Sequence, residues 1–272
     1  MVDALIDKGK SNVLGVYVDA VDYAAATDKV IEAARDRRPL ALTALAVHGV
    51  MTGVQDRAHE ARLNSFDVVT PDGQPVRWAL NLLHKAQLPD RTYGPTLTMK
   101  VVERCADEDL PIYLYGSTQP VLDRLTAALT ARFPKLTIAG SEPSKFRPNE
   151  PGEPEAIARR ITDSGARVVL VGLGCPRQEI FVHAMRPLVS LPMMAVGAAF
   201  DYHAGDLRKP PPWMQQRGLE WLWRLGLEPK RLWRRYLILN PAYLARLTAQ
   251  ATRLWPARPA EPTTTPADTF AV

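Results

Sequence analysis

Short apolar runs alternate with helical patterns along most of this chain, and that alternation constrains the fold more than any other feature. The longest apolar runs, such as 168–174 and 193–200, are too short to span a membrane and fit buried strands, which usually span roughly four to eight residues. Amphipathic stretches of helical length separate such runs. Strands that alternate with helices form a mainly parallel sheet, so we predict an α/β fold with a Rossmann-like sheet and helices on both faces.

The individual elements follow from the same pattern. The predicted strands are 13–18, 40–47, 67–69, 111–115, 136–139, 167–171 and 192–196. The predicted helices between them are 20–35, 50–63, 74–83, 95–106, 119–132, 154–164 and 176–185, the last with Pro176 at its first position. Strands stop after Asp201, and the following helices, each opening with a proline, are predicted at 212–225, 229–239 and 241–254.

Three regions result from this pattern. We predict an α/β domain at 1–205 and a helical C-terminal appendage at 206–255. The last stretch, 256–272, is rich in Pro, Thr and Ala, a composition typical of disorder.

The formal net charge of +5 is unevenly distributed. Arg208–Arg258 contains eleven Lys or Arg and two acidic residues, a local balance of +9, so the rest of the chain totals −4. Five of the six tryptophans lie in the same stretch. Basic residues mixed with tryptophan favour an anionic surface, which can be membrane head groups, phosphates or nucleic acid.

The remaining composition limits the class of protein. No apolar run reaches the ~18–20 residues of a spanning helix, and residues 1–10 do not resemble a signal peptide. The two cysteines, Cys105 and Cys175, have no zinc-ligand spacing and fit a reduced, cytosolic protein. We therefore expect a cytoplasmic protein without a metal centre, which contacts a membrane, if at all, from its surface.

Polar and glycine-rich loops follow several predicted strands, and ligands of an open parallel sheet bind beyond the carboxyl ends of its strands. Glycines in such loops let the backbone approach a phosphate, and the next helix start offers free N–H groups. The alternative is a set of ordinary tight turns. The loops are 70–73, 116–119, 172–179 and 197–201, and the nucleotide-binding candidates in them are Gly116, Gly172, Gly174, Gln178 and Asp201.

Asp72 follows a predicted buried strand and precedes a predicted helix. An aspartate in this place is most often an N-cap of the helix. The same place also suits a general base, because the pocket of the sheet opens there. The local spacing leaves both roles open.

Five blocks of sequence together resemble the WecG/TagA/CpsF glycosyltransferases, in the same order and at similar spacing. The resemblance runs from about Val13 to about Tyr236. It implies a fold of the GT-E type, a UDP-sugar donor, an undecaprenyl-diphosphate-linked acceptor, an inverting reaction and no metal cofactor. The blocks are Thr70-Pro71-Asp72-Gly73, Asp90-Arg91-Thr92-Tyr93-Gly94, Gly172-Leu173-Gly174-Cys175-Pro176-Arg177-Gln178-Glu179, Val196-Gly197-Ala198-Ala199-Phe200-Asp201, and Gly218–Leu225 with Glu228–Arg231.

The resemblance assigns roles to individual residues. It makes Asp72 the catalytic base, which takes the proton of the acceptor hydroxyl. The substrate-binding residues that it implies are Arg91, Gln178, Arg224, Arg231 and Arg234. Guanidinium groups pair with phosphates and can stabilise a departing diphosphate without Mg²⁺. The family also implies work at the inner face of a bacterial membrane, with 1–205 as the catalytic domain and 206–255 as the membrane-proximal part.

The chain departs from the family pattern after its second predicted strand. Ala44-Leu45-Ala46 stands where the family usually has Thr-x-Asn, and this leaves the identity of the transferred sugar open. His48 is close enough in sequence to substitute, although a packing or capping role is the more common one. Asp107-Glu108-Asp109 has the spacing of a metal-binding Asp-x-Asp motif, but it precedes a strand and is predicted at the wrong edge of the sheet.

The expected activity is transfer of a hexosamine, hexose or uronic acid in the synthesis of a bacterial surface polysaccharide. The expected partners are a UDP-sugar, a lipid-linked acceptor and an anionic membrane, with a homo-oligomer left open. A degenerate nucleotide-binding regulatory or scaffolding protein is the alternative, because Ala44 and Ala46 lack polar side chains. A nucleic-acid-binding protein is less well supported, since the basic appendage contains no recognisable recognition module.

Overall fold

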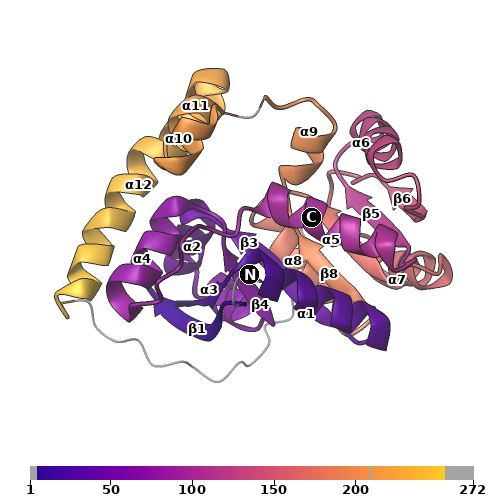
Figure 1. Ribbon diagram of the computed structural model, residues 1–272, viewed down its shortest axis with the longest axis horizontal. Helices are drawn as coiled ribbons and strands as arrows, with labels where there is room; N and C mark the ends of the chain where they lie inside the picture. Colours follow the sequence, from indigo (N-terminus) through magenta and orange to yellow (C-terminus); the bar gives the residue numbers. More distant parts are fainter. Residues whose placement is uncertain (1–4, 209, 255–272) are drawn as a thin grey trace.

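The computed structural model describes residues 5–208 and 210–254 (Figure 1). The predicted tail at 256–272 lies outside these residues. The strands are β1 (Asp7–Val13), β2 (Val16–Val21), β3 (Leu40–Leu45), β4 (Val68–Pro71), β5 (Ile112–Gly116), β6 (Ile138–Glu142), β7 (Val168–Gly172) and β8 (Pro192–Ala195). The helices are α1 (Tyr23–Asp36), α2 (Val47–Gln55), α3 (Arg57–Asn64), α4 (Gln74–His84), α5 (Gly94–Asp107), α6 (Gln119–Arg132), α7 (Glu153–Asp163), α8 (Arg177–Met185), α9 (Ala199–His203), α10 (Pro212–Gln216), α11 (Glu220–Leu227) and α12 (Pro229–Ala251).

A six-stranded parallel sheet with the order β4-β3-β8-β7-β5-β6 forms the centre of the fold. Two clusters of buried apolar side chains lie on its two faces. One contains side chains of α2, α3, α4, α7 and α8, and the other contains side chains of α1, α5, α6 and α9. The predicted α/β fold with helices on both faces is therefore confirmed. Because every strand of this sheet runs in the same direction, the loops after β3, β4, β5, β7 and β8 meet at one edge.

The predicted strand at 13–18 is wrong, because a turn interrupts it. Leu14 and Gly15 both adopt positive φ and connect β1 to β2 as an antiparallel hairpin, which is separate from the main sheet. A two-residue connection of this kind needs left-handed backbone, which glycine supplies without steric cost. The apolar run therefore belongs to two strands that pack on the same core.

The predicted helix at 50–63 is also interrupted. Asp56 separates α2 from α3, and its carboxylate accepts hydrogen bonds from the backbone N–H groups of Ala58 and His59. A capping aspartate starts a new helix more effectively than it continues an old one.

In a smaller correction, Pro176 is the N-cap residue of α8 instead of its first helical residue. The short helix α9 was not predicted.

The appendage differs from the prediction of three helices that each begin at a proline. The stretch 212–225 forms α10 and α11 with a break at 217–219, and Pro241 lies inside the single long helix α12. Proline costs one helical hydrogen bond, so packing must hold this helix together. Tyr243 is 1% exposed, and its hydroxyl donates to the carbonyl of Pro75 at 3.1 Å.

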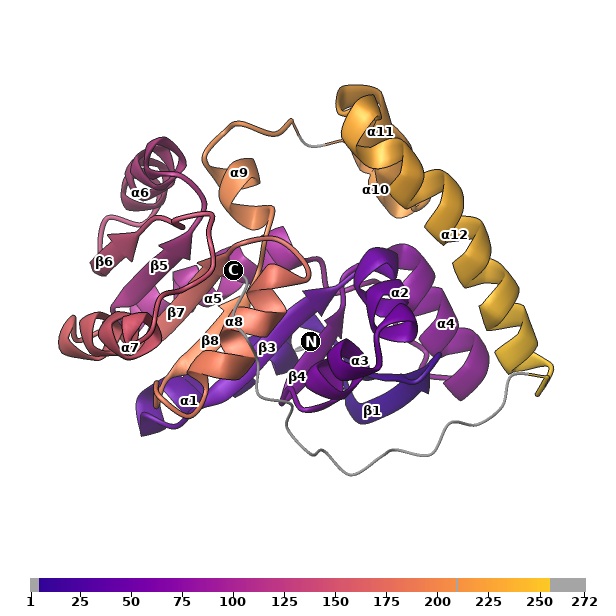
Figure 2. The same ribbon diagram turned by 180° about the vertical axis from the view of Figure 1, so that it is seen from behind.

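The second half of α12 thus packs onto the α/β part of the chain. It lies beside α2 and α4 in both views (Figures 1 and 2). The side-chain oxygen of Gln250 also accepts from the backbone N–H of Leu14 at 2.9 Å. The boundaries at 205 and 255 stay predictions, but α12 shares a core with the α/β part. No helix among the described residues is long and apolar enough to span a bilayer.

Candidate active site

A cavity of 620 Å³ opens at the carboxyl edge of the sheet. Its wall includes residues from each of the loops 70–73, 116–119, 172–179 and 197–201, which the sequence indicated as ligand loops. The appendage completes the wall with residues of α11 and α12, among them Glu220, Arg224 and Tyr236. The pocket therefore combines residues as far apart in the chain as Ala44 and Asn240.

Asp72 directly follows β4 and lines this pocket. It is not the N-cap of α4, because Gly73 occupies that position and makes no side-chain capping bond. Instead, Asp72 Oδ1 accepts a hydrogen bond of 2.6 Å from the backbone N–H of Gly94, the first residue of α5. Burial raises the pKa of the Asp72 carboxyl to about 6, although Arg91 and the Gly94 N–H act in the opposite direction. A carboxyl with such a pKa is suited to exchange a proton near neutral pH.

Arg91 is buried beside Asp72 and forms an ion pair with the appendage. Its Nη2 donates to Glu220 Oε2 at 2.6 Å, and the side chains of this pair are 8% and 12% exposed. The same glutamate accepts from the hydroxyls of Tyr93 at 2.7 Å and Tyr202 at 3.4 Å. The Arg91 guanidinium also lies 4.3 Å from the centre of the Tyr93 ring. This network connects α11 to the loop that carries Arg91.

The start of α8 forms the opposite wall of the pocket. Gln178 and Glu179 are buried there, and Glu179 Oε1 accepts from the Thr43 hydroxyl and the Gln178 amide, each at 2.9 Å. Gln178 Oε1 has no hydrogen-bond partner among the described residues. Burial raises the pKa of Glu179. An amide with an unused acceptor at the pocket wall is a suitable contact for a ligand that donates hydrogen bonds.

The candidate nucleotide-binding residues differ in their access to the pocket. Gly172, Gly174 and Asp201 line it, whereas Gly116 is not part of its wall. A Cβ atom on Gly116 would stand 2.8 Å from the carbonyl oxygen of Gly172, so this glycine permits close packing of the ends of β5 and β7. Gly174 has φ of 77° and open space around it, which leaves its backbone accessible.

The predicted arginines of the appendage are not brought together in one place. Arg224 lines the pocket, its Nε is buried without a hydrogen-bond partner, and its Nη2 is 3.8 Å from Glu228. Arg234 is exposed on α12, with its guanidinium 5.5 Å from the centre of the Trp233 ring, and it is not part of the pocket wall. Arg231 is in the first turn of α12, but its side chain lies outside the described residues.

Several helices point their N-termini at the pocket without a side-chain cap. The N-cap residues of α2, α4 and α8 are Ala46, Gly73 and Pro176, and none of them makes a side-chain capping bond. Residues of the first turn of each helix line the cavity. Uncapped N–H groups and the helix dipoles produce a positive potential there, which favours an anion such as a diphosphate.

Ala44 and Ala46 line the pocket near Asp72, so no polar side chain replaces the family's Thr and Asn at these positions. His48 also lines the pocket, from the first turn of α2. It therefore faces the space where the reacting groups are expected. The structure also places Phe146 at the pocket, and Arg177 lies over its ring at 5.8 Å.

Four residues of this site were not selected from the sequence. Tyr93 and Glu220 belong to the quoted blocks, but their types alone gave no reason to choose them over their neighbours. Tyr202 and Phe146 lay outside any recognised pattern, and an exposed aromatic residue in a loop between two prolines was the available signal for Phe146.

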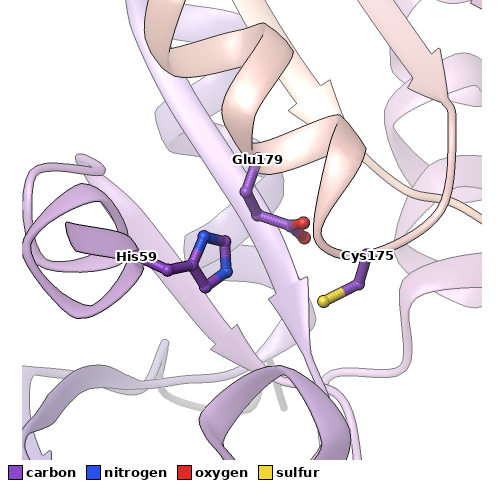
Figure 3. Close-up of side chains that lie close together, drawn as sticks. All are labelled: His59, Cys175 and Glu179. Carbon is purple, nitrogen blue, oxygen red and sulfur yellow. The ribbon is translucent and has the colours of Figure 1, made fainter. Parts of the chain in front are cut away.

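His59, Cys175 and Glu179 form a cluster in which potential metal-ligand atoms lie within 4.8 Å of one another (Figure 3). Arg62 Nη1 is 3.1 Å from His59 Nδ1, and because a guanidinium only donates, Nδ1 accepts and the ring proton is on Nε2. Nε2 is the nitrogen that faces the cluster (Figure 3). A metal would have to displace that proton, so the cluster is not prepared for a cation. Burial lowers the pKa of His59 to about 4, so the ring is neutral.

The Asp-x-Asp motif at 107–109 lies at the edge of the sheet that the sequence predicted. Asp107 ends α5 and Asp109 precedes β5, at the amino edge of the sheet and away from the pocket. Glu108 between them pairs with Arg35 and Arg104 at the surface. Within the described part of the chain, the motif therefore lies outside the pocket, and the residue between its two aspartates serves surface ion pairs.

The model of the glycosyl transferase WecG/TagA/CpsF family matches residues 11–257, which is most of the chain.

Proposed function

Because the chain belongs to the WecG/TagA/CpsF glycosyltransferase family, we propose that it transfers a sugar from a UDP-sugar to an undecaprenyl-diphosphate-linked acceptor. The reaction inverts the anomeric carbon and needs no metal ion. The family acts in the synthesis of cell-surface polysaccharides. One observation carries the proposal: a carboxyl with a raised pKa, Asp72, shares a pocket with Arg224 and with the uncapped starts of three helices.

Asp72 is the general base in this proposal. Its ionised carboxylate takes the proton of the acceptor hydroxyl as that oxygen attacks the anomeric carbon from the face opposite the UDP. The hydrogen bond from the Gly94 N–H fixes Oδ1, which leaves Oδ2 for the hydroxyl. Ala44, Ala46 and Gly73 form the pocket wall near the base. Their side chains are small or absent, so they leave space for a sugar ring.

The departing UDP gains negative charge, and positive groups at fixed positions in the pocket stabilise that charge. Arg224 supplies a guanidinium with an unused buried N–H. The first turns of α2, α4 and α8 also line the pocket, and the backbone N–H groups of their first residues, Val47, Gln74 and Arg177, are assigned to the diphosphate. Such groups are already oriented before the reaction and stabilise a developing anion without a cation. Gln178, Asp201 and the ring of Phe146 are assigned to the nucleoside, through hydrogen bonds and stacking.

The exposed face of α12 supports work at a membrane surface. Trp233, Leu237, Ile238 and Leu244 are each about half exposed on this helix, while Leu232, Tyr243 and Leu247 are buried on its other side. Lys230 and Arg234 flank the apolar face and are exposed. We assign this face to an anionic lipid surface, since apolar side chains enter the interface and each basic residue near it adds ~1 kcal/mol. The lipid-linked acceptor lies in the same surface, at the inner face of the membrane.

The test is release of UDP and transfer of sugar by the purified protein. UDP-sugars are screened for slow hydrolysis, and the active donor is then used with a short-chain lipid-diphosphate-sugar acceptor. The proposal predicts UDP release that the acceptor accelerates and that Asp72→Asn lowers. Tight UDP binding without release or transfer, for any donor and acceptor tried, would favour the alternative of a nucleotide-binding scaffold, which the two alanines at 44 and 46 suggest.

A further inference from the structure

Glu220 connects the appendage to the region of the base. It lies in the first turn of α11 and accepts hydrogen bonds from the loop before α5, through Arg91, and from α9, through Tyr202. Its partner Arg91 is 129 positions away in the chain. Both side chains of the ion pair are nearly buried. A carboxylate that is removed from water is stabilised by such charged and hydroxyl donors, so this position is specific for an acidic residue.

Arg91 lies between two carboxylates and makes its ion pair with only one of them. Both Asp72 and Glu220 interact with its charge, but within the described residues its hydrogen-bonded partner is Glu220. Asp72 accepts from the Gly94 N–H instead. A buried guanidinium does not lose its charge, so it requires a counterion nearby. Glu220 fills this role and leaves Asp72 unpaired with Arg91.

We propose that Glu220 is a positioning residue for the transfer reaction, which holds Arg91 away from Asp72 and so keeps the base free to accept the proton of the acceptor hydroxyl. This inference rests on the proposed function, in which Asp72 is the base. If the charge of Glu220 is removed, Asp72 becomes the remaining counterion of Arg91. The two then pair, and the carboxylate of Asp72 holds a proton less strongly.

The surroundings of Asp72 contain other groups that act on the same carboxyl. Arg224 on α11 lowers the pKa of Asp72, in the same direction as Arg91. Tyr93 and Tyr202 stay protonated, since burial raises the pKa of each. The further titratable side chains in the wall of the pocket are those of His48, Cys175, Arg177, Glu179, Asp201 and Tyr236. Among the described residues, none of them forms a hydrogen bond with the Arg91 guanidinium, so Glu220 is the group whose removal releases it.

The experiment measures the protonation of Asp72 directly. Protein labelled with ¹³C at the aspartate carboxyls is titrated by NMR, and the Asp72 signal is identified by its loss in Asp72→Asn. In Glu220→Gln, the pKa of Asp72 should fall from about 6 by about one unit. The acidic limb of kcat/KM should move to lower pH by the same amount, and kcat on the plateau should fall ~3–10-fold, because a weaker base accepts a proton less readily.

Two further variants make the result specific. Glu108→Gln removes a glutamate that is also paired with arginines but lies at the opposite edge of the sheet, and it should leave both the titration and the pH profile unchanged. Glu220→Asp retains the charge with a shorter side chain that cannot reach Arg91 and Tyr93 together. It should shift the pKa of Asp72 in the same direction by a smaller amount, and it gives a readout if Glu220→Gln does not fold.

The outcomes separate this inference from the proposed function. An Asp72 titration that is unmoved or moves upward in the folded Glu220 variants overturns the inference, and so does an equal shift in Glu108→Gln. Sugar transfer with an unmoved titration overturns the inference alone. A shifted titration in a protein that neither releases UDP nor transfers sugar overturns the proposed function instead.

Discussion

The carboxylate of Asp72 accepts a hydrogen bond from the backbone N–H of Gly94, so the residue after β4 caps α5 and not the helix that follows it directly. The sequence left two roles open for Asp72, a helix cap and a general base. The cap of the following helix is wrong, because Gly73 is the N-cap of α4, and one carboxylate oxygen of Asp72 serves the start of α5 while the residue lines the pocket. The hydrogen bond orients the side chain without neutralising it.

We expect Asp72→Asn to lower turnover by ~10²-fold or more, the usual loss on removal of a general base. The amide oxygen of asparagine can still accept from the Gly94 N–H, so folding and UDP binding should be retained. Transfer rate and UDP affinity are measured on the same preparation. Asp56→Asn is the matched control, since Asp56 caps α3 far from the pocket and asparagine caps a helix equally well. Near-normal turnover in Asp72→Asn would remove Asp72 from the role of base.

Because the pKa of Asp72 is raised, ionisation of its carboxyl should lower the stability of the fold while it activates the base. The folded protein binds this proton more tightly than the unfolded chain, whose aspartates titrate near 4, so the contribution of Asp72 to stability falls as pH rises from about 4 to about 6. At pH 7 the ionised carboxylate costs ~2–3 kcal/mol relative to a neutral group. Asp72→Asn should therefore unfold at a higher denaturant concentration than the wild type at pH 7, and the difference should vanish near pH 4. A variant that is less stable at pH 7 would contradict the burial of this charge.

The rate should depend on pH through the same group. Since the base must be ionised, kcat/KM should fall about tenfold per pH unit below about pH 6 and reach a plateau above it. The profile is measured with the active donor and a fixed, subsaturating acceptor concentration. A profile that is flat down to pH 4.5 would mean that another group takes the proton.

Transfer should continue in the presence of EDTA. Arg224 and the N-termini of α2, α4 and α8 provide positive charge for the diphosphate. The acids of 107–109 lie at the other edge of the sheet, and Glu108 among them is paired with Arg35 and Arg104. Activity is compared before and after chelation and after Mg²⁺ or Mn²⁺ is restored. A strict requirement for a divalent ion would contradict the assignment of the diphosphate charge to Arg224 and the helix N-termini.

Arg224→Ala should weaken the binding of UDP by roughly 10–100-fold, as expected for the loss of a hydrogen-bonded charge in a partly buried site. Isothermal titration calorimetry with UDP measures this directly. Arg217→Ala is the control, because Arg217 is an exposed arginine of the appendage that lies outside the pocket wall. Equal affinity in Arg224→Ala and the wild type would assign Arg224 to the acceptor or to structure.

Leu237→Glu combined with Ile238→Glu should abolish binding to vesicles that contain anionic phosphatidylglycerol, since both residues are more than half exposed on the apolar face of α12. Added salt should weaken the binding of the wild type. Leu82→Glu, on the exposed side of α4, is the control. Substitutions are preferable to truncation, because Tyr243 and Leu247 belong to the core. Equal binding to neutral phosphatidylcholine vesicles would exclude an electrostatic component.

The pattern of apolar runs determined the sheet, because a buried parallel strand needs a nearly continuous apolar sequence. It predicted β3, β5, β7 and β8 within one or two residues at each end. It failed where a turn interrupts an apolar run, as at Leu14-Gly15, and where packing overrides a local rule, as at Pro241, which the buried side of α12 tolerates. Local preferences do not encode the contacts that decide such cases.

The sequence also identified Asp72, Arg91, Gln178 and Arg224 as site residues, because each has a fixed position within the ordered sequence blocks. The structure brings all four to one pocket. The partners of these residues were decided by the tertiary structure alone. Glu220 reaches Arg91 across 129 positions, and the Gly94 N–H reaches Asp72 from another helix. Burial and charge around a carboxyl depend on the distance in space between such groups, and a linear sequence does not contain that distance. The sequence therefore determined which charged and polar groups are present, and the tertiary structure decided which of them form ion pairs and hydrogen bonds with one another.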